Sequence, residues 1–250
     1  MNISGNTILI TGGGSGIGRG LAEAFHALGN EVIIAGRRKS VLDETTAANP
    51  GMKSASLNIE DADSIRAFAE RIQKDYPALN VVIHNAGIMR PENLKSPNLA
   101  DAEAIITTNL LGPMRLNAGL LPLLLKQPHS SVMTVSSGLA YVPLALTPTY
   151  CATKAAVHSW TQSLRHQLKD TKVEVLEIIP PYVQTELTGA QQASDPRAMP
   201  LKDYIAETID ILKTQPTPAE ICVERVKFLS CAAESGKYDE AFSTLNSMAF

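Results

Sequence analysis

The segment that most limits the possible folds is a glycine-rich run at residues 11–18, TGGGSGIG. It directly follows a short apolar run, residues 7–10, and leads into apolar residues at helical spacing from Gly16 to Leu28. A strand, a glycine turn and a helix in this order predict a dinucleotide-binding unit, because backbone amides at the start of a helix attract a pyrophosphate. The glycines alone also fit a plain tight turn. The residues expected at the pyrophosphate are Gly12, Gly14, Ser15, Gly16, Ile17 and Gly18.

A second apolar run, residues 32–35, ends in Gly36, Arg37 and Arg38. In a dinucleotide fold this is where the chain meets the adenosine ribose. An acidic residue here would hydrogen-bond the ribose 2′-hydroxyl and repel a 2′-phosphate, whereas guanidinium groups suit phosphate. Arg37 and Arg38 therefore favour NADP over NAD. The alternative is that both arginines are solvated loop residues.

Tyr150 and Lys154 stand four residues apart in a predicted helix over residues 149–169, so they share one helix face. A nearby ammonium favours a phenolate, and we expect Lys154 to lower the Tyr150 pKa from its ordinary value of about 10. Ser137 follows the apolar run 131–135, a predicted strand, and so lies where ligands bind in parallel sheets. Alone, Ser137 could cap a turn, Tyr150 could be core, and Lys154 could be a solvated charge.

Together, Gly-x3-Gly-x-Gly at residues 12–18 and Ser-x12-Tyr-x3-Lys at Ser137, Tyr150 and Lys154 resemble the short-chain dehydrogenase/reductase family. The resemblance covers nearly the whole chain. It implies hydride transfer between a nicotinamide and a carbonyl or secondary alcohol. It also implies that Ser137 binds the reacting oxygen, that Tyr150 exchanges a proton with it, and that Lys154 lowers the Tyr150 pKa and holds the nicotinamide ribose.

The same resemblance implies roles for further residues. Asn109, between helical stretches 99–108 and 111–126, corresponds to an asparagine that holds a proton-relay water, although it also fits a polar group at a bend near Gly112-Pro113. His84 departs from the family's Asn-Asn-Ala-Gly pattern, and we expect a structural histidine near the sheet edge. The cofactor contacts implied outside the glycine loop are Arg37, Arg38, Asn58, Ile59, Asn85, Ala86, Gly87, Tyr150, Lys154, Val183 and Thr185.

Two positions depart from the family pattern near the cofactor. Asn58 stands where the family usually has Asp, but an amide oxygen can accept the same hydrogen bond from adenine. Pro181 replaces the glycine of Pro-Gly-x-Val-x-Thr, and proline fixes φ and donates no backbone hydrogen bond. We therefore expect a different turn before Val183.

The spacing of apolar runs predicts an α/β fold. Strand-sized runs without alternation, separated by helical patterns, are typical of buried parallel strands. We expect a single-domain Rossmann-type doubly wound parallel sheet of about six strands, with a helical carboxy-terminal tail over 221–233 and 239–245. The expected parts are a cofactor half (1–90), a catalytic half (91–185), a polar substrate flap (about 186–215) and the tail (216–250). The tail and the PPYVQT sequence at 180–185 resemble the DltE-type subgroup.

Composition argues against several partners. A formal net charge of −3 offers no basic field for nucleic acid or anionic lipid, and no apolar run approaches the roughly 18 residues of a membrane span. The start carries no secretion signal, and three widely spaced cysteines fit reduced thiols in the cytoplasm. No cluster of His, Cys or carboxylate residues has convincing metal-ligand spacing, so we expect no metal.

The predicted function is that of an NADP(H)-dependent oxidoreductase acting on a small carbonyl or alcohol compound. The alternative is a non-catalytic NADP(H)-binding regulator or sensor on the same fold, while the glycine spacing disfavours a nucleotide-sugar epimerase. Small alanines beside Trp160 predict close approach of another helix, and the resemblance implies a homodimer through the helices near 99–126 and 149–169. We expect His158 and His166 at the surface or interface of the second helix.

Overall fold

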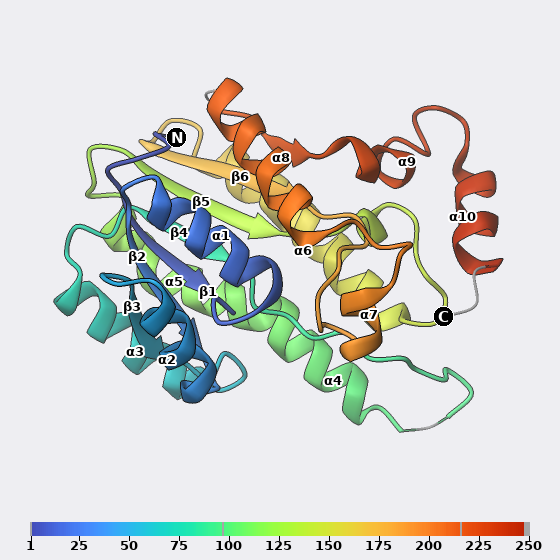
Figure 1. The fold of residues 1–250 in the computed structure, drawn as a ribbon, viewed down its shortest axis with the longest axis horizontal. Helices are drawn as coiled ribbons and strands as arrows, with labels where there is room; N and C mark the ends of the chain where they lie inside the picture. Colours follow the sequence, from blue (N-terminus) through green and yellow to red (C-terminus); the bar gives the residue numbers. More distant parts are fainter. Residues whose placement is uncertain (1, 97, 216, 248–250) are drawn as a thin grey trace.

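A seven-stranded parallel sheet forms the centre of the molecule (Figure 1). The computed structural model describes residues 2–96, 98–215 and 217–247. The strand order is β3-β2-β1-β4-β5-β6-β7, and every neighbouring pair is parallel. The strands are β1 Thr7–Thr11, β2 Glu31–Gly36, β3 Lys53–Ser56, β4 Val81–His84, β5 Ser130–Val135, β6 Val173–Ile179 and β7 Glu220–Cys222. The predicted doubly wound α/β fold is confirmed.

The number of strands and the start of the tail differ from the prediction. We expected six strands and a helix from Ile221, but Glu220–Cys222 forms β7 and pairs with β6 at the edge of the sheet. Ile221 is buried in the core, and three residues are too few for strand periodicity to be recognised. Within 217–247 the rest of the tail is mainly helical, as predicted. Its helices are η3 Glu224–Val226, α9 Lys227–Ser230 and α10 Tyr238–Ser247, and 216 and 248–250 lie outside the described residues.

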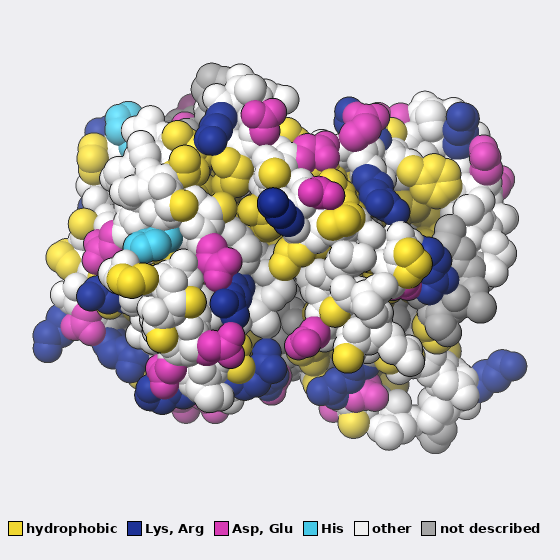
Figure 2. All heavy atoms as spheres, viewed as in Figure 1, with side chains coloured by type: hydrophobic (Ala, Val, Ile, Leu, Met, Phe, Trp, Pro, Cys, Tyr) yellow, Lys and Arg dark blue, Asp and Glu magenta, His cyan; other side chains and the backbone are white. Residues whose placement is uncertain are grey.

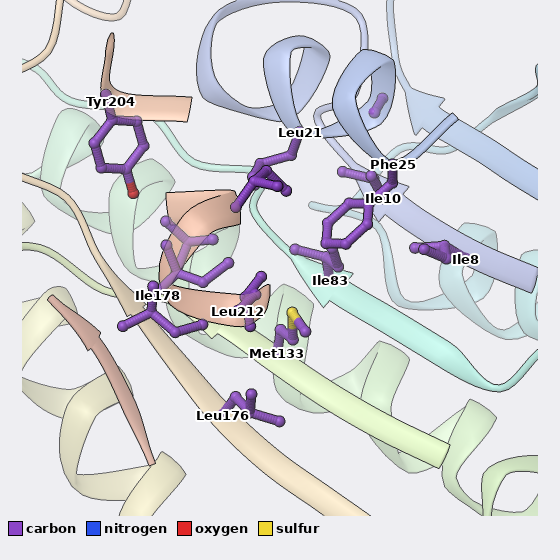
Figure 3. Packing of buried hydrophobic residues seen from close by; sticks show 14 of the residues in the cluster. Ile8, Ile10, Leu21, Phe25, Ile83, Met133, Leu176, Ile178, Tyr204 and Leu212 are labelled. Atoms are coloured by element: carbon purple, nitrogen blue, oxygen red, sulfur yellow. The ribbon is translucent and has the colours of Figure 1, made fainter. Parts of the chain in front are cut away.

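Helices cover both faces of the sheet (Figure 1). On one face Leu21 and Phe25 of α1 and Tyr204 of α8 pack on strand residues such as Ile10, as Figure 3 shows. On the other face Phe68, Leu120 and Leu164 belong to a second buried cluster. The first face carries α1 Gly16–Ala27, α2 Lys39–Ala48 and α8 Leu201–Thr214, and the second carries α3 Ala62–Asp75, α5 Gly112–Leu124 and α6 Pro148–Gln167. Their apolar residues recur at helical spacing, which explains why each helix buries one side.

One long helical segment contains a turn of π-helix. It consists of α4 Ala100–Ile106, the π-helical turn η1 Thr107–Leu111, and α5, where we had expected two helices with a bend near Gly112-Pro113. Pro113 has no N–H and therefore cannot donate the ordinary helical hydrogen bond to the Asn109 carbonyl. Single π-helical turns of this kind occur frequently at functional sites. The turn holds the Asn109 side chain in the protein interior.

His84 was predicted to lie near the sheet edge, and this was wrong. It ends β4, which is the central strand, and its buried ring lies edge-on to Trp160 with ring centroids 6.5 Å apart. Burial lowers the pKa of His84 to about 4, so the ring is neutral near neutral pH. A structural role for His84 agrees with these contacts.

Two features of the exterior bear on the expected partners. Figure 2 shows acidic and basic side chains interspersed over one face, without a continuous basic area. Among the helices in the described part of the chain, none has both the length and the apolar character needed to span a membrane.

Candidate active site

The glycine loop is fixed by hydrogen bonds between the ends of β1 and β4. The Thr11 hydroxyl accepts hydrogen bonds from the backbone N–H groups of Asn85 and Ala86, each at 3.0 Å, and the Asn85 side-chain amide donates to the Thr11 carbonyl at 2.9 Å. Gly12 has a φ of +68°, which favours glycine. A Cβ atom on Gly18 would lie 2.3 Å from the Gly12 carbonyl oxygen, so this close approach also requires glycine. Asn85 and Ala86 thus hold the predicted pyrophosphate loop in shape.

Asn109 connects the loop after β4 to α6. Its side-chain oxygen accepts from the Ile88 N–H at 2.8 Å, and its side-chain nitrogen donates to the Ile88 carbonyl at 2.9 Å and to the Thr153 hydroxyl at 3.3 Å. Gly87 lies against the Asn109 side chain, where an added Cβ would be 3.3 Å from Oδ1. The Asn109 side chain is therefore occupied by structural contacts.

Ser137, Tyr150 and Lys154 come together at the carboxyl end of β5. Ser137 follows that strand and caps the short helix η2 Gly138–Ala140 by accepting from the Leu139 N–H at 3.1 Å. Tyr150 and Lys154 lie one turn apart on α6, with the Lys154 Nζ 5.4 Å from the centre of the Tyr150 ring. The Lys154 Nζ donates to the Val135 carbonyl oxygen at 2.7 Å. The three predicted catalytic side chains are all buried and adjacent.

The predicted lowering of the Tyr150 pKa is not observed. Burial of the phenol raises its pKa well above the ordinary value, Cys151 adds to this effect, and the Ser137 hydroxyl opposes it. Burial also lowers the pKa of Lys154 to about 8, an effect that the Glu177 carboxylate opposes. Tyr150 therefore remains protonated at neutral pH because its desolvation outweighs favourable neighbours.

The two arginines at the expected adenosine end have different partners. The Arg38 guanidinium lies 3.3 Å from the Ser15 hydroxyl of the glycine loop, whereas Arg37 forms a salt bridge with Glu60 at 2.6 Å. Both arginines are exposed. Asn58 uses its side-chain oxygen to accept from the Glu60 N–H at 3.3 Å, and Ile59 is buried against Gly112. Arg38 is thus the arginine directed towards the loop.

The segment after β6 brings Thr185 next to the glycine loop, with the buried Val183 two residues before it. A Cβ on Gly16 would lie 3.4 Å from the Thr185 side chain. Gln192, in the short helix α7 Ala190–Ser194, donates to the Val183 carbonyl at 2.8 Å and to the Thr185 hydroxyl at 3.0 Å. These contacts hold residues 183–185, directly after Pro181 and Tyr182, in place. The predicted flap therefore includes a helix, and Gln192 was not recognised from the sequence.

The carboxy-terminal helix α10 also contributes to this region, which the sequence did not indicate. Leu245 packs against a buried cluster that contains Tyr150, Ile105 and Leu144. Asn246 accepts a hydrogen bond from the Ala145 N–H at 2.6 Å and donates to the Pro143 carbonyl at 3.1 Å. These contacts join segments about a hundred residues apart, so no local pattern could have revealed them. The apolar residues Leu139 and Leu144 therefore share a cluster with Leu245 of the tail.

The chain belongs to the short-chain dehydrogenase family, whose pattern matches residues 6–196. It is accordingly an oxidoreductase of a family that uses nicotinamide dinucleotides. Over 98% of both chains it is 40% identical to an uncharacterized oxidoreductase, DltE, of Bacillus subtilis. This relationship agrees with the subgroup predicted from the tail and the PPYVQT sequence.

Solved structures share the fold. A short-chain dehydrogenase from Burkholderia cenocepacia in complex with NADP superposes with a TM-score of 0.81 and 22% identity, over 99% of this chain and all of that one. A short-chain dehydrogenase/reductase from Burkholderia phymatum in complex with NAD has a TM-score of 0.81 and 18% identity, over 100% of this chain and 98% of that one. At these identities the likeness establishes the fold, and the two complexes differ in cofactor.

The burial of Lys154 makes stability depend on pH. Its pKa is about 8 in the folded protein and near 10.5 in the unfolded chain, so between these values the unfolded state binds more protons. The free energy of unfolding should therefore rise with pH in this interval. Relative to Lys154→Met, we expect the wild type to gain roughly 3 kcal/mol from pH 7.5 to 10.5, measured by urea denaturation. Parallel pH curves for the two proteins would contradict this expectation.

Proposed function

We propose that this chain is an NADP(H)-dependent reductase of small carbonyl compounds, also able to oxidise the corresponding secondary alcohols. The observation that carries the proposal is the meeting of Ser137, Tyr150 and Lys154 beside the glycine loop. A phenol that is protonated at neutral pH has a proton to donate to a carbonyl oxygen during reduction, and the same group can take the proton back during oxidation.

The shape of the site fits a dinucleotide. The glycine loop presents backbone where side chains would clash, at the start of α1, and such helix starts favour phosphate. In this proposal the loop residues Gly12–Gly18 hold the pyrophosphate, Asn58 and Ile59 face the adenine, and Asn85–Gly87 line the ribose. Lys154 binds the nicotinamide ribose hydroxyls, and Val183 and Thr185 bind the carboxamide. The bound nicotinamide supplies or accepts the hydride.

Side chains of the protein transfer the proton and stabilise the charge that develops during the reaction. Ser137 donates a hydrogen bond to the substrate oxygen, where negative charge grows during reduction. Tyr150 delivers the proton to that oxygen, and the nearby Lys154 ammonium stabilises the phenolate that remains. The Asn109 carbonyl has no α-helical N–H partner because Pro113 follows four residues later, so it is suited to hold a water that returns the proton. Asn109 would therefore hold this water with its backbone carbonyl, while its side chain keeps its structural contacts.

The substrate should present an apolar group next to its carbonyl. Ile88, Met89 and Leu139 pack with Leu245 around the buried cluster that includes Tyr150. Apolar contacts of this kind bind hydrocarbon parts of a ligand and discriminate among them only weakly. We therefore favour a range of apolar ketones and aldehydes. We also retain the cytoplasm as the expected location, since Cys151, Cys222 and Cys231 are free thiols.

Replacing Tyr150 by Phe tests the proton donor. We expect Tyr150→Phe to reduce turnover of a ketone and aldehyde panel about a hundredfold or more, because the variant lacks the acidic hydroxyl. NADPH binding, followed by fluorescence, should remain nearly unchanged. Tyr76→Phe, far from the site at the end of α3, is the matched control and should retain full turnover.

The same assay separates the enzyme from a regulator. Tight NADPH binding by the wild type without loss of NADPH absorbance on any carbonyl substrate would favour the non-catalytic sensor. Equal turnover by the wild type and Tyr150→Phe would instead remove Tyr150 from the mechanism while leaving an enzyme.

The arginines test cofactor preference. Arg38 lies over the glycine loop, whereas Arg37 is already paired with Glu60. We expect Arg38→Ala to weaken NADPH binding about tenfold or more and to leave NADH binding nearly constant, because only NADPH carries the 2′-phosphate. Arg37→Ala should have a smaller effect. Equal losses of NADPH and NADH affinity in Arg38→Ala would contradict a phosphate-binding role, and tighter binding of NADH by the wild type would overturn the preference itself.

We further propose that the chain forms a homodimer through α4–α5 and α6. Apolar side chains of the first segment are exposed, among them Ile106 and Leu111, as are Ala152 and Ala155 on α6. Light scattering should give twice the chain mass for the wild type, and Ile106→Asp should shift the protein towards a monomer. Phe242→Asp on α10, similarly exposed, is the control and should remain a dimer. A monomeric wild type would contradict this proposal.

A further inference from the structure

A carboxylate is buried directly behind the active site. Glu177 lies in the middle of β6 between apolar neighbours and has 0% of its surface exposed. It pairs in register with Thr134 of β5, one residue before Val135, whose carbonyl accepts the hydrogen bond from Lys154. Burying an ionised carboxylate is costly unless a charged or hydrogen-bonding group compensates it. The position of Glu177 near Lys154, and the free-energy cost of burying its carboxylate, indicate a functional role for this residue.

His158 compensates and orients the Glu177 carboxylate. Its Nδ1 atom lies 2.8 Å from one Glu177 oxygen and 3.0 Å from the other. The Gln162 amide nitrogen lies 3.1 Å from His158 Nε2, an arrangement in which Nε2 accepts and Nδ1 carries the proton. The Nδ1–H group therefore donates to the Glu177 carboxylate. His158 is thus half-buried, with 20% of its side chain exposed, and its inner nitrogen faces a fully buried carboxylate, which the predicted surface or interface position did not indicate.

The Glu177–His158 pair lies next to Lys154. Lys154 and His158 are four residues apart on α6 and therefore share one helix face. Lys154 is only 5% exposed, and its ammonium group bonds a neutral carbonyl. Within the described part of the chain, no carboxylate lies within salt-bridge distance of it. The Glu177 carboxylate raises the pKa of Lys154 and thereby offsets part of the effect of burial.

We propose that Glu177, oriented by His158, is a positioning residue that keeps the Lys154 ammonium group charged beside Tyr150. This inference rests on the proposed reductase function, because it gives Glu177 a role through Lys154. Glu177 does not touch the reacting atoms. Its carboxylate, on β6, supplies the negative charge that the buried Lys154 cation requires. Because this charge comes from the sheet, the side of Lys154 next to Tyr150 stays available for the cofactor.

Metal binding is the other use that these side chains allow. Ligand atoms of His158, Glu177 and Glu220 lie within 4.8 Å of one another. However, the Nδ1 atom that a metal would need already faces both Glu177 oxygens at hydrogen-bond distance. The histidine proton therefore satisfies the buried carboxylate, and the observations favour the charge-setting role.

Other titratable groups surround the pair and must be considered in any pH dependence. The pKa of Tyr141 is raised by burial and by the four acidic groups near it, Glu177, Glu220, Cys222 and Cys231. Burial and Glu220 raise the pKa of Cys222 to about 11, so this thiol stays neutral below that pH. Lys154 faces Tyr150, and Glu177 faces His158, whose Nδ1 atom also lies 3.3 Å from the Tyr141 hydroxyl. Glu220 and Cys222 from β7 and Cys231 after α9 surround Tyr141.

The pH profile of turnover tests the proposal. Glu177→Gln removes the charge but keeps the shape and an oxygen that accepts from His158. Wild-type turnover should fall as the pH rises through about 8, where Lys154 loses its proton. In Glu177→Gln this fall should move down by about one pH unit, because Lys154 has lost its compensating charge. Glu177→Met should show the same shift, which provides a second variant if the first folds poorly.

Two control variants separate charge from structure. Glu177→Asp keeps the carboxylate and should restore the wild-type profile, even if the shorter side chain lowers stability. Glu220→Gln removes an exposed carboxylate from the neighbouring strand and should leave the profile in place. A profile that stays unchanged in Glu177→Gln, or that moves equally in Glu220→Gln, would overturn the proposal. Loss of the wild-type profile after chelation, with recovery on adding Zn²⁺, would also overturn it in favour of a metal site.

A measurement without substrate distinguishes this inference from the proposed function. In a double-mutant cycle of Glu177→Gln and Lys154→Met at pH 7, the unfolding equilibrium constants should deviate from additivity by about tenfold, since the two charges stabilise each other. Strictly additive effects would refute the pairing even in an active enzyme. Coupling in a protein that turns over no carbonyl would leave the pairing intact and refute the reductase.

Discussion

A continuous set of hydrogen bonds links the glycine loop to the helix that carries Tyr150. The Thr11 hydroxyl accepts from the backbone of Asn85 and Ala86, and the loop that begins there continues to Ile88. The Asn109 side chain accepts from the Ile88 N–H and donates to the Thr153 hydroxyl. The Thr153 hydroxyl in turn donates to the Tyr150 carbonyl. Each group is buried or partly buried, so an unpaired member would carry a desolvation cost. The distance between the glycine loop and α6 is therefore set by polar contacts, and the apolar clusters on the two sheet faces hold the strands and helices that carry these groups.

The features that could be predicted from the sequence are those with a local cause. Glycines that follow an apolar strand, and a tyrosine and a lysine one helical turn apart, require no knowledge of distant contacts. The fold class followed from strand-sized apolar runs, and the site followed from the order of parallel strands, whose carboxyl ends meet at one edge. The roles of the individual site residues remain predictions.

The features that were missed depend on burial or on distant segments. Desolvation of Tyr150 reversed the expected direction of its pKa, and the extent of burial cannot be read from spacing. The three-residue strand β7 forms because β6 offers an edge, and nothing in Glu220–Cys222 distinguishes it from the start of a helix. Glu177 could have been noticed in the sequence as a carboxylate within an apolar strand. Its role could not be inferred there, because its partner His158 lies on a different element.

The attachment of α10 to the 143–145 segment has a practical consequence. Asn246 binds Pro143 and Ala145, so the last described turn of α10 lies against the apolar cluster that contains Tyr150. The Asn2 carbonyl, by contrast, accepts a hydrogen bond from the Asn6 side chain just before β1, so Asn2 lies near the amino-terminal ends of the strands, and the chain start is marked N in Figure 1. A bulky label attached to the exposed Ser247, at the end of α10, would thus lie near the proposed catalytic side chains, whereas one attached to the exposed Asn2 would not.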